Sequence, residues 1–582
     1  MSEFITQEIR HWTGVRLDRE RTDLEMDELA YALNADLFLE RGVIRTRRGS
    51  SRLTSSTITD LVIRRIARIN SIRYQVAATA LYRAGVSIQT GLHSSLVTTI
   101  QPYRPLNDTS TWAFIADASG MKKDDGTNLR NWGITGPAAA PTLGTTGTGL
   151  TGSYKAVYTY IRKVGSSVIA ESNPSAEPGA QSLTNQNLTV AVTASSDAQV
   201  THIRIYRTVA SGSAYLYDQE VANTTATITS SQADSALGAE VEDDNDTPPA
   251  CGFVSPADDG RLWLTQDPSF PHYVYYTKRF RPEAVPADNY LEITTPEDPV
   301  QCVIPFGGIR LAFCKARKYR IIGSGTTPFI FQETPSKRGT PSWAAAAAGE
   351  DGVYFLARDG VFRTNGFGPD EQVAGSILPL FKGQSVNGYS AINWDQASKF
   401  SLAIFERNLY VSWADGSNTN PNIVWVNRIG TEKWEAYEYP TGLSSLHYEE
   451  DTGYLAAGGQ DGFVYQLETG ANDAGASISM TVDSKDYGHV TPETPGGTLA
   501  RHLFRFIRED LEGGTFTTRF YADGTSKHVA SVATTRRPAP IALPADAQGY
   551  RWRKRWTYSG IAVARIYGTS VQAMPLEMSD DG

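Results

Sequence analysis

A short phrase recurs through the middle of the chain and constrains its fold more than any other feature. A turn containing Asp-Gly or Gly is followed at once by a strand in which aromatic and aliphatic residues alternate. Asp-Gly favours the turns of positive φ that reverse one antiparallel strand into the next. The copies are Asp259–Leu264, Asp351–Leu356, Asp359–Phe362 and Asp461–Tyr465, with cognate strands lacking the aspartate at Gly308–Phe313 and Asn408–Trp413.

The spacing of this phrase predicts a repeated unit of several strands. The steps between successive copies are about 48, 44, 56 and 54 residues, measured between Gly260, Gly308, Gly352, Asn408 and Gly462. Repeats of 40–50 residues with several strands are typical of β-propeller blades. The 51 glycines, 28 tyrosines and 11 tryptophans, with few long helical patterns, also favour an all-β protein. We therefore expect a β-propeller with an inserted immunoglobulin/fibronectin-like sandwich and a C-terminal β domain.

Changes in composition suggest where the domains begin and end. Residues 136–152 and 470–475 are rich in small residues and are interpreted as linkers, and residues 242–249 are acidic and contain proline. The expected parts are an N-terminal hook or interface segment (1–60, with a short helix or extended hook at 27–34), first propeller strands (61–135), the inserted sandwich (136–250), propeller blades (251–470) and a C-terminal β-sandwich region (471–582). Strands of the last part could instead complete the propeller. Removal of residues 136–249 is expected to leave the propeller folded.

Charge and cysteine content exclude several classes of protein. A net charge of −9 without long runs excludes a generic nucleic-acid-coating surface, but it suits a wall that DNA slides past without adhesion. Three cysteines argue against a disulfide scaffold and for synthesis in a reducing compartment. Residues 1–12 lack the apolar core of a secretory signal, and no run of 18 apolar residues predicts a membrane span.

No motif predicts catalysis, so we expect no catalytic, cofactor-binding or metal-binding residues. Gly144–Gly149 lacks the lysine of a phosphate loop, and the eight histidines are scattered. A glycosidase would need paired carboxylates in a cleft. Cys302 and Cys314, possible neighbours across a hairpin, are interpreted as buried thiols. The candidate carboxylates are Asp258, Asp259, Glu283 and Asp288, but aspartate is commonplace in propeller turns.

Two clusters of basic residues are the candidate functional sites. One contains Arg41, Arg45, Arg47, Arg48 and Arg52. In the other, alternation along 551–556 places Trp552, Lys554 and Trp556 on one strand face and three arginines on the opposite face. The second cluster is a strand with a core face and a solvated basic face, an interface with an acidic partner subunit, or a site of direct nucleic-acid binding. The candidate interface residues are Arg45, Arg47, Arg48, Arg551, Arg553 and Arg555, and reversing the charges of Arg47 and Arg48 is expected to impair assembly more than folding.

Several phrases resemble a known family. The chain looks like the tail nozzle, or tail tubular protein, of short-tailed bacteriophages, and it is similar to the tail-closing stabilisation proteins of related phages. The resemblance covers about residues 25–60 and 255–470, so the expected inserted sandwich lies outside it. It rests on Leu29–Asp36, Gly42–Gly49, Gly260–Leu264 followed by Tyr273–Tyr276, Pro282–Tyr290 and Asp351–Val361.

The resemblance implies a structural protein of the virion tail, synthesised in the host cytoplasm. It implies a ring, commonly a hexamer, that extends the DNA channel below the portal and the tail adaptor protein. Double-stranded DNA would pass transiently without specific binding, tail fibres or spikes would attach at the periphery, and neither a cofactor nor stable membrane insertion is expected. The alternatives are a tail hub or receptor-binding protein, a polysaccharide-degrading propeller enzyme, and an unrelated cellular propeller.

Overall fold

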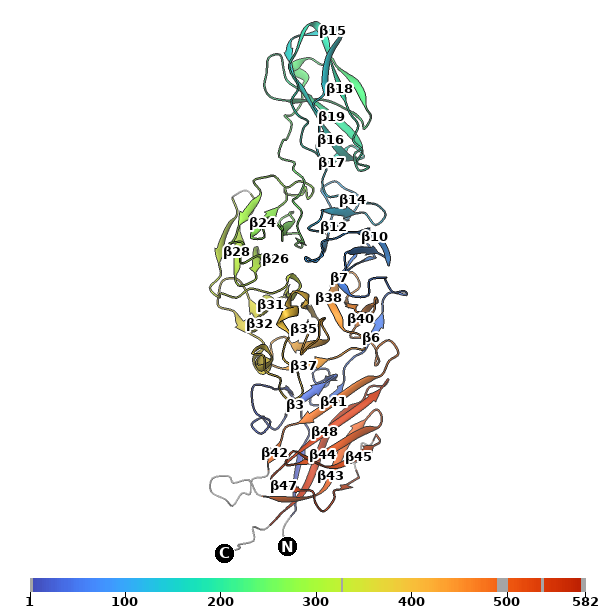
Figure 1. Ribbon diagram of the computed structural model, residues 1–582, viewed down its shortest axis with the longest axis vertical. Coiled ribbons are helices and arrows are strands. Elements are labelled where there is room, and N and C mark those ends of the chain that lie inside the picture. Colours follow the sequence, from blue (N-terminus) through green and yellow to red (C-terminus); the bar gives the residue numbers. More distant parts are fainter. Residues whose placement is uncertain (1–3, 326–327, 489–500, 535–538, 577–582) are drawn as a thin grey trace. The chain divides into compact units, whose positions relative to one another are not determined.

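The computed structural model describes residues 4–325, 328–488, 501–534 and 539–576, and almost all of its regular structure is β-strand (Figure 1). The all-β prediction is therefore confirmed. The chain divides into two compact units, one formed by residues 1–66 and 338–582 and the other by residues 67–337. Among the described residues, no helix has both the length and the apolar character that a membrane crossing requires.

Residues 67–337 contain four antiparallel four-stranded sheets in which sequential strands are neighbours. Their tight turns follow the predicted chemistry: Asp259 and Gly260 have φ of 48° and 69°, and Asp258 and Arg261 exchange backbone hydrogen bonds of 3.0 and 2.9 Å. The sheets are β7–β10 (Ile63–Ile69, Ile72–Ala77, Ala80–Arg83, Val86–Thr90), β11–β14 (Thr99–Tyr103, Trp112–Ala116, Lys122–Asp124, Leu129–Asn131), β22–β25 (Phe253–Val254, Trp263–Thr265, Tyr273–Tyr276, Tyr290–Glu292) and β26–β29 (Val300–Phe306, Ile309–Cys314, Lys318–Ile322, Ile330–Glu333).

Successive sheets of this unit share their cores. Ile115 on β12 packs with Val76 on β8, whereas Phe114, the next residue along β12, packs with Leu264 on β23. One strand thus supplies apolar side chains to both of its faces, as expected of a sheet covered on each side. Cys302 and Cys314 are buried and free, as predicted.

A separate pair of sheets lies within the insertion and encloses a core of its own. One sheet has the order β15–β18–β21 (Thr142–Tyr154, Gln181–Val192, Ala226–Ser230), and the other has the order β17–β16–β19–β20 (Ser167–Glu171, Ala156–Val164, His202–Arg207, Leu216–Ala222). Residues 142–152, predicted to be a linker, are instead most of β15. Pairing with β18 and inward packing of Leu143 and Leu150 outweigh the weak strand propensity of its glycines.

The other unit contains three further four-stranded arrays. They are β30–β33 (Ala346–Ala348, Val353–Ala357, Gly360–Thr364, Glu371–Gln372), β34–β37 (Ser401–Phe405, Asn408–Trp413, Ile423–Arg428, Trp434–Tyr437) and β38–β40 (Leu443–Glu449, Tyr454–Gly459, Val464–Leu467), the last completed by β6 (Ser50–Arg52). The array β34–β37 does not end at β37. It continues through two strands from the start of the chain into the C-terminal region, giving one sheet of eleven strands.

That long sheet and a second sheet of seven strands build the C-terminal region together with the N-terminal segment. From β37 the long sheet runs through β2 (Gly14–Val15), β3 (Glu28–Leu33), β41 (Ile478–Ser484), β48 (Arg551–Gly560), β44 (Phe516–Ala522) and β45 (Thr525–Val532), with β42 (Tyr487–Gly488) beside β48 (Figure 1). The second has the order β4–β5–β49–β43–β46 (Ala35–Asp36, Ile44–Thr46, Arg565–Pro575, His502–Glu512, Ile541–Ala542), with β1 (Ile5–Ile9) on β49 and β47 (Gln548–Gly549) on β43.

The N-terminal segment is thus part of these sheets. Residues 28–33, for which a short helix or an extended hook was expected, are strand β3, so the helical alternative is wrong. Leu29 and Ala32 are fully buried, and β3 pairs with β2 on one side and β41 on the other. Two partner strands satisfy the backbone of a segment that a helix would have satisfied internally.

Candidate functional site: the arginine clusters

Strand β48 has the alternation that its sequence predicts. Trp552, Lys554 and Trp556 are at most 1% exposed, and the three arginines between and before them lie on the opposite face of the sheet. Lys554 forms an ion pair with Glu509 in the core, and Glu509 also accepts a 3.0 Å hydrogen bond from Trp556 Nε1. The lysine is therefore a paired core residue.

On the opposite face, one aspartate holds several arginines. Asp483 on β41 is 1% exposed and accepts hydrogen bonds of 2.5 and 2.7 Å from Nε and Nη2 of Arg555. Arg21 Nη2 and Arg553 Nη1 lie 3.5 and 3.7 Å from its second oxygen. The hydrogen bond to Asp483 raises the pKa of Arg555 although burial opposes the shift. The guanidinium groups are thus positioned by a carboxylate that sits beneath them.

This face carries more cations than the aspartate can neutralise. Arg519 lies directly opposite Arg555 across β44 and β48, and like charges in this position repel each other. We define the arginine face as Arg21, Arg519, Arg551, Arg553 and Arg555. Asp483 and Asp486 form ion pairs with Arg21, Arg553 and Arg555, and the carboxylate of Asp523 accepts a 2.9 Å hydrogen bond from the backbone N–H of Arg551. Three carboxylates thus meet five arginines. Both Arg519 and Arg551 are exposed, so the face can bind an acidic surface.

The N-terminal arginine cluster differs, because its central member is internal. Arg47 is 0% exposed and donates to both carboxylate oxygens of Asp473 at 2.9 and 2.6 Å, to Asn34 Oδ1 at 2.9 Å and to the Glu438 carbonyl at 2.7 Å. Its guanidinium also stacks 3.9 Å from the centre of the Tyr439 ring. The interface role expected of Arg47 is therefore wrong, since all its donors serve the fold of its own chain.

The two neighbours of Arg47 in the candidate set lie nearer the surface. Arg45 forms a 3.3 Å ion pair with Glu40, a carboxylate that also binds Arg565 on the adjacent strand. Arg48 forms a 3.1 Å ion pair with Glu406, and their side chains are 30% and 55% exposed. Asp473, in the segment 470–475 that was expected to be a linker, instead fixes Arg47 and Ser50.

A buried group of four charges was not anticipated from the sequence. Arg162, on β16 of the insertion, forms 2.8 Å ion pairs with Asp108 and with Glu283, and Lys123 on β13 lies 2.6 Å from the second oxygen of Glu283. All four side chains are at most 7% exposed. Although burial opposes it, attraction to Lys123 and Arg162 lowers the pKa of Glu283. The only sequence signal was a charged residue, Arg162, within an apolar strand.

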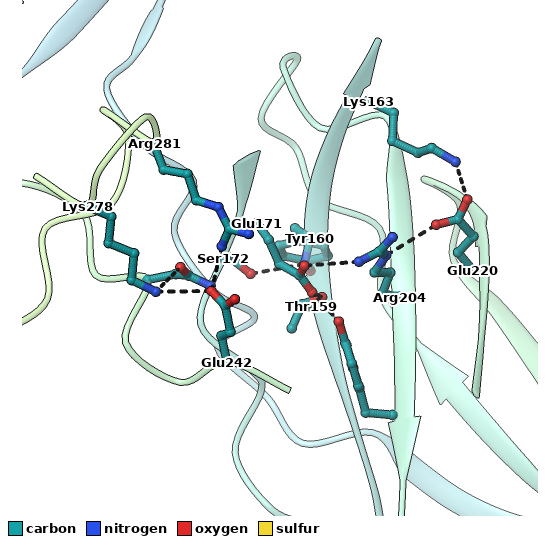
Figure 2. A network of polar contacts seen from close by, with 12 residues as sticks. Thr159, Tyr160, Lys163, Glu171, Ser172, Arg204, Glu220, Glu242, Lys278 and Arg281 are labelled. Atoms are coloured by element: carbon teal, nitrogen blue, oxygen red, sulfur yellow. Dashed lines mark hydrogen bonds and ion pairs between the residues drawn. The ribbon is translucent and has the colours of Figure 1, made fainter. Parts of the chain in front are cut away.

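Further polar contacts surround a pocket of about 300 Å³ beside this group. Figure 2 shows Arg204 between Glu171 and Glu220, and Glu242 in contact with Lys278 and Arg281. Each carboxylate of the pocket wall in this view has a cationic partner. The insertion is therefore attached by side-chain contacts as well as by its two chain connections, which weakens the expectation that it can be removed without effect on the rest.

Three of the four carboxylates considered for glycoside hydrolysis are engaged in ion pairs. Asp258 binds Arg310, Asp259 lies 2.7 Å from Arg279, and Glu283 belongs to the buried group. In the part of the chain that the structure describes, no group of three or more histidine, cysteine, aspartate or glutamate side chains could hold a metal ion.

Comparison with known proteins gives only remote structural similarity. No protein-family model matches the chain, and no curated protein matches it. Solved structures with a similar arrangement include the extracellular domain of the one-component system BT4673 from B. thetaiotaomicron (10% identity, TM-score 0.25, 90% of this chain and 82% of that one). Another is the AfRom2 CNH domain (8% identity, TM-score 0.27, 73% of this chain and 98% of that one).

Proposed function

We propose that this protein is a structural component of a short-tailed phage virion, the tail nozzle, which forms a ring and extends the DNA channel below the portal and adaptor. The observation that carries the proposal is the placement of the family-like phrases in the fold. Leu29–Asp36 forms β3 and β4, Gly260–Leu264 leads into β23, and Asp351–Val361 spans β31 and the start of β32. These three phrases therefore lie in or lead into strands that build sheets, as expected for a shared scaffold, whereas Pro282–Tyr290 is a loop that ends at the start of β25.

We also propose that the four-stranded arrays are the blades of one β-propeller. Four arrays lie in residues 63–333 and three in the other unit, giving seven outside the insertion. In the last array the N-terminal strand β6 pairs with β40, the kind of closure by a distant strand that a circular fold needs. The insertion, with its three- and four-stranded sheets around one core, is proposed to be of the immunoglobulin/fibronectin type.

In this proposal the arginine face binds an acidic surface of an adjacent tail component. Asp483 holds Arg21, Arg553 and Arg555 in place, so these side chains lose little entropy on binding. Arg519 and Arg551 are the exposed cations that would contact the partner first. An oppositely charged partner would be attracted over distances comparable with the Debye length, about 8 Å at physiological ionic strength. Bulk DNA would be repelled by the chain's net negative charge.

Electron microscopy of the purified protein, alone and with its adaptor, tests the proposal. We expect rings with a central channel, and a reconstruction would show whether the seven arrays close into one propeller. The double variant Arg519→Glu/Arg551→Glu should fold normally but fail to join the adaptor or the neighbouring copy. Arg505→Glu/Arg508→Glu is the matched control, because those arginines are exposed on β43 in the other sheet. A stably monomeric protein that is absent from virus particles would refute the proposal.

A further inference from the structure

The three-stranded sheet of the insertion differs from every other surface discussed above in having no charge. Strands β15, β18 and β21 contain no aspartate, glutamate, lysine or arginine, although 20% of the chain is charged. The facing sheet of the same domain has the usual charges, including Lys163, Arg204 and Glu220. Depletion of charge is the compositional signal of an interface core, whereas ordinary soluble surfaces mix both signs.

The outward side of this sheet is also flat and built from small side chains. Leu143, Val190 and Ile228 form one cross-strand row that points into the core. Side chains alternate along strands, so the neighbouring rows point outward. These outward rows are Gly144, Thr189 and Thr229, and Thr142, Ala191 and Thr227. Such rows leave the backbone of the sheet accessible along its whole width.

The edge of β15 is open, whereas comparable edges of the domain are covered. The outer edge of β20 is paired by residues 238–241, through backbone bonds such as Tyr217 N to Ala239 O at 2.8 Å. On β21 the carbonyl of Thr229 accepts a 2.9 Å hydrogen bond from Gln219 Nε2. Along residues 142–150 of the described chain, no backbone hydrogen bond reaches the side of β15 away from β18.

Proteins normally protect such an edge. Lysine, proline or inward charges on an edge strand prevent pairing with another chain, and β15, the longest strand of the described residues at 13 residues, has none of these. It has two irregularities, between Thr146 and Leu150 and between Leu150 and Gly152, so the regular part is Thr142–Thr146. An edge that is regular over five residues, uncharged and unpaired is a template for one more strand.

We propose that β15 is a self-association site, at which the β15 strands of two copies pair antiparallel about a two-fold axis. The pairing would join two three-stranded sheets into one of six strands. Side chains of the incoming strand that continue the inward row of Leu143 must be uncharged, because a charge there would be desolvated without a partner. The same edge of a second copy meets this requirement, and a two-fold axis makes the contact self-complementary.

This inference does not depend on the proposed function, and a concentration series separates the two. Hydrogen exchange of the unmodified full-length protein should slow in peptides covering residues 142–150 as protein concentration rises, while peptides covering 226–230 should not change. Analytical ultracentrifugation should show association over the same range. Protection at 142–150 in a dimer that forms no ring would support the inference while counting against the nozzle. Rings without concentration-dependent protection at 142–150 would overturn the inference alone.

A pair of matched variants identifies the edge. Thr142→Lys/Thr146→Lys places charges on the outward face of β15, and Thr227→Lys/Thr229→Lys places them on the outward face of β21, where both threonines are also exposed. We expect the first pair to weaken self-association at least tenfold, because like charges meet across the two-fold axis, and the second to change it by less than about threefold. Equal effects of the two variants, or none from the first, would overturn the proposal.

Discussion

Replacement of Arg162 by methionine is the most informative test of how the insertion is held. The substitution keeps the long apolar stem and removes two 2.8 Å ion pairs, leaving Asp108 and Glu283 with Lys123 as their only cation in the group. Removing one partner of a buried pair costs about 3–5 kcal/mol, because the remaining charge stays out of water. Asp108 keeps two hydrogen bonds of 3.0 Å, from Ser110 N and from Trp112 Nε1, and these offset a minor part of this.

Hydrogen exchange of the native protein measures this effect locally. A loss of about 3–5 kcal/mol corresponds to exchange faster by about two to three and a half orders of magnitude, in peptides covering residues 112–124 and 156–164. The control is Lys155→Met, which removes an ion pair with Glu177 on the surface of the same domain and should alter exchange by no more than a few fold. Exchange in Arg162→Met within a few fold of the unmodified protein would refute the reasoning, since it would show that the four charges are hydrated or already poorly paired.

Three further outcomes follow from other charged residues. Arg47→Met should lower the free energy of unfolding by about 3–5 kcal/mol. Arg48→Met should change it little, because its pair with Glu406 is partly exposed to solvent. Thermal melts that show the two variants to be equal would contradict the internal role of Arg47. Burial, followed by the charge of Asp36, raises the pKa of Glu468 to about 7. This folded-state pKa lies above the unfolded-state pKa of about 4.3. The stabilisation that Glu468 contributes is therefore complete below the unfolded-state pKa and is lost as pH rises through 7. Urea unfolding of Glu468→Gln should therefore depend less on pH between 5 and 8 than unfolding of the unmodified protein, and parallel pH profiles would exclude a raised pKa. Acid should act in the opposite sense on the buried group around Arg162, because the pKa of Asp108 is lowered despite its burial. The stabilisation from Asp108 is present above its unfolded-state pKa and is lost as pH falls through its folded-state pKa. Asp108→Asn should therefore weaken the dependence of hydrogen exchange on acid.

Local pattern was sufficient to predict the parts of the structure that depend on neighbours in sequence. Alternation along 551–556 predicts which side of β48 is buried, and Asp259-Gly260 predicts a turn of positive φ, because both effects arise within a few residues. Burial of Cys302 and Cys314 likewise follows from the apolar strands around them.

Features that depend on distant partners could not be predicted in this way. The Gly- and Thr-rich stretch at 142–152 has the composition of a linker, and only the presence of β18 beside it makes it a strand. The residues next to Arg47 in the sequence do not distinguish it from a surface arginine. Its burial depends on Asp473 and Glu438, which are distant in the sequence and accept its hydrogen bonds. The four buried charges around Arg162 come from three separate stretches of chain, so no spacing in the sequence records their contact.

Strands from the first residues of the chain have a consequence for its synthesis. Strand β6 completes an array whose other members emerge from the ribosome some 400 residues later, as shown by the hydrogen bond from Val464 N to Thr54 Oγ1 at a separation of 410 residues. Gln7 reaches Trp552 at a separation of 545. The N-terminal strands of the nascent chain therefore have unsatisfied edges until residues 464–552 have been synthesised. A chain that stopped before residue 464 would leave those edges exposed to pairing with other chains.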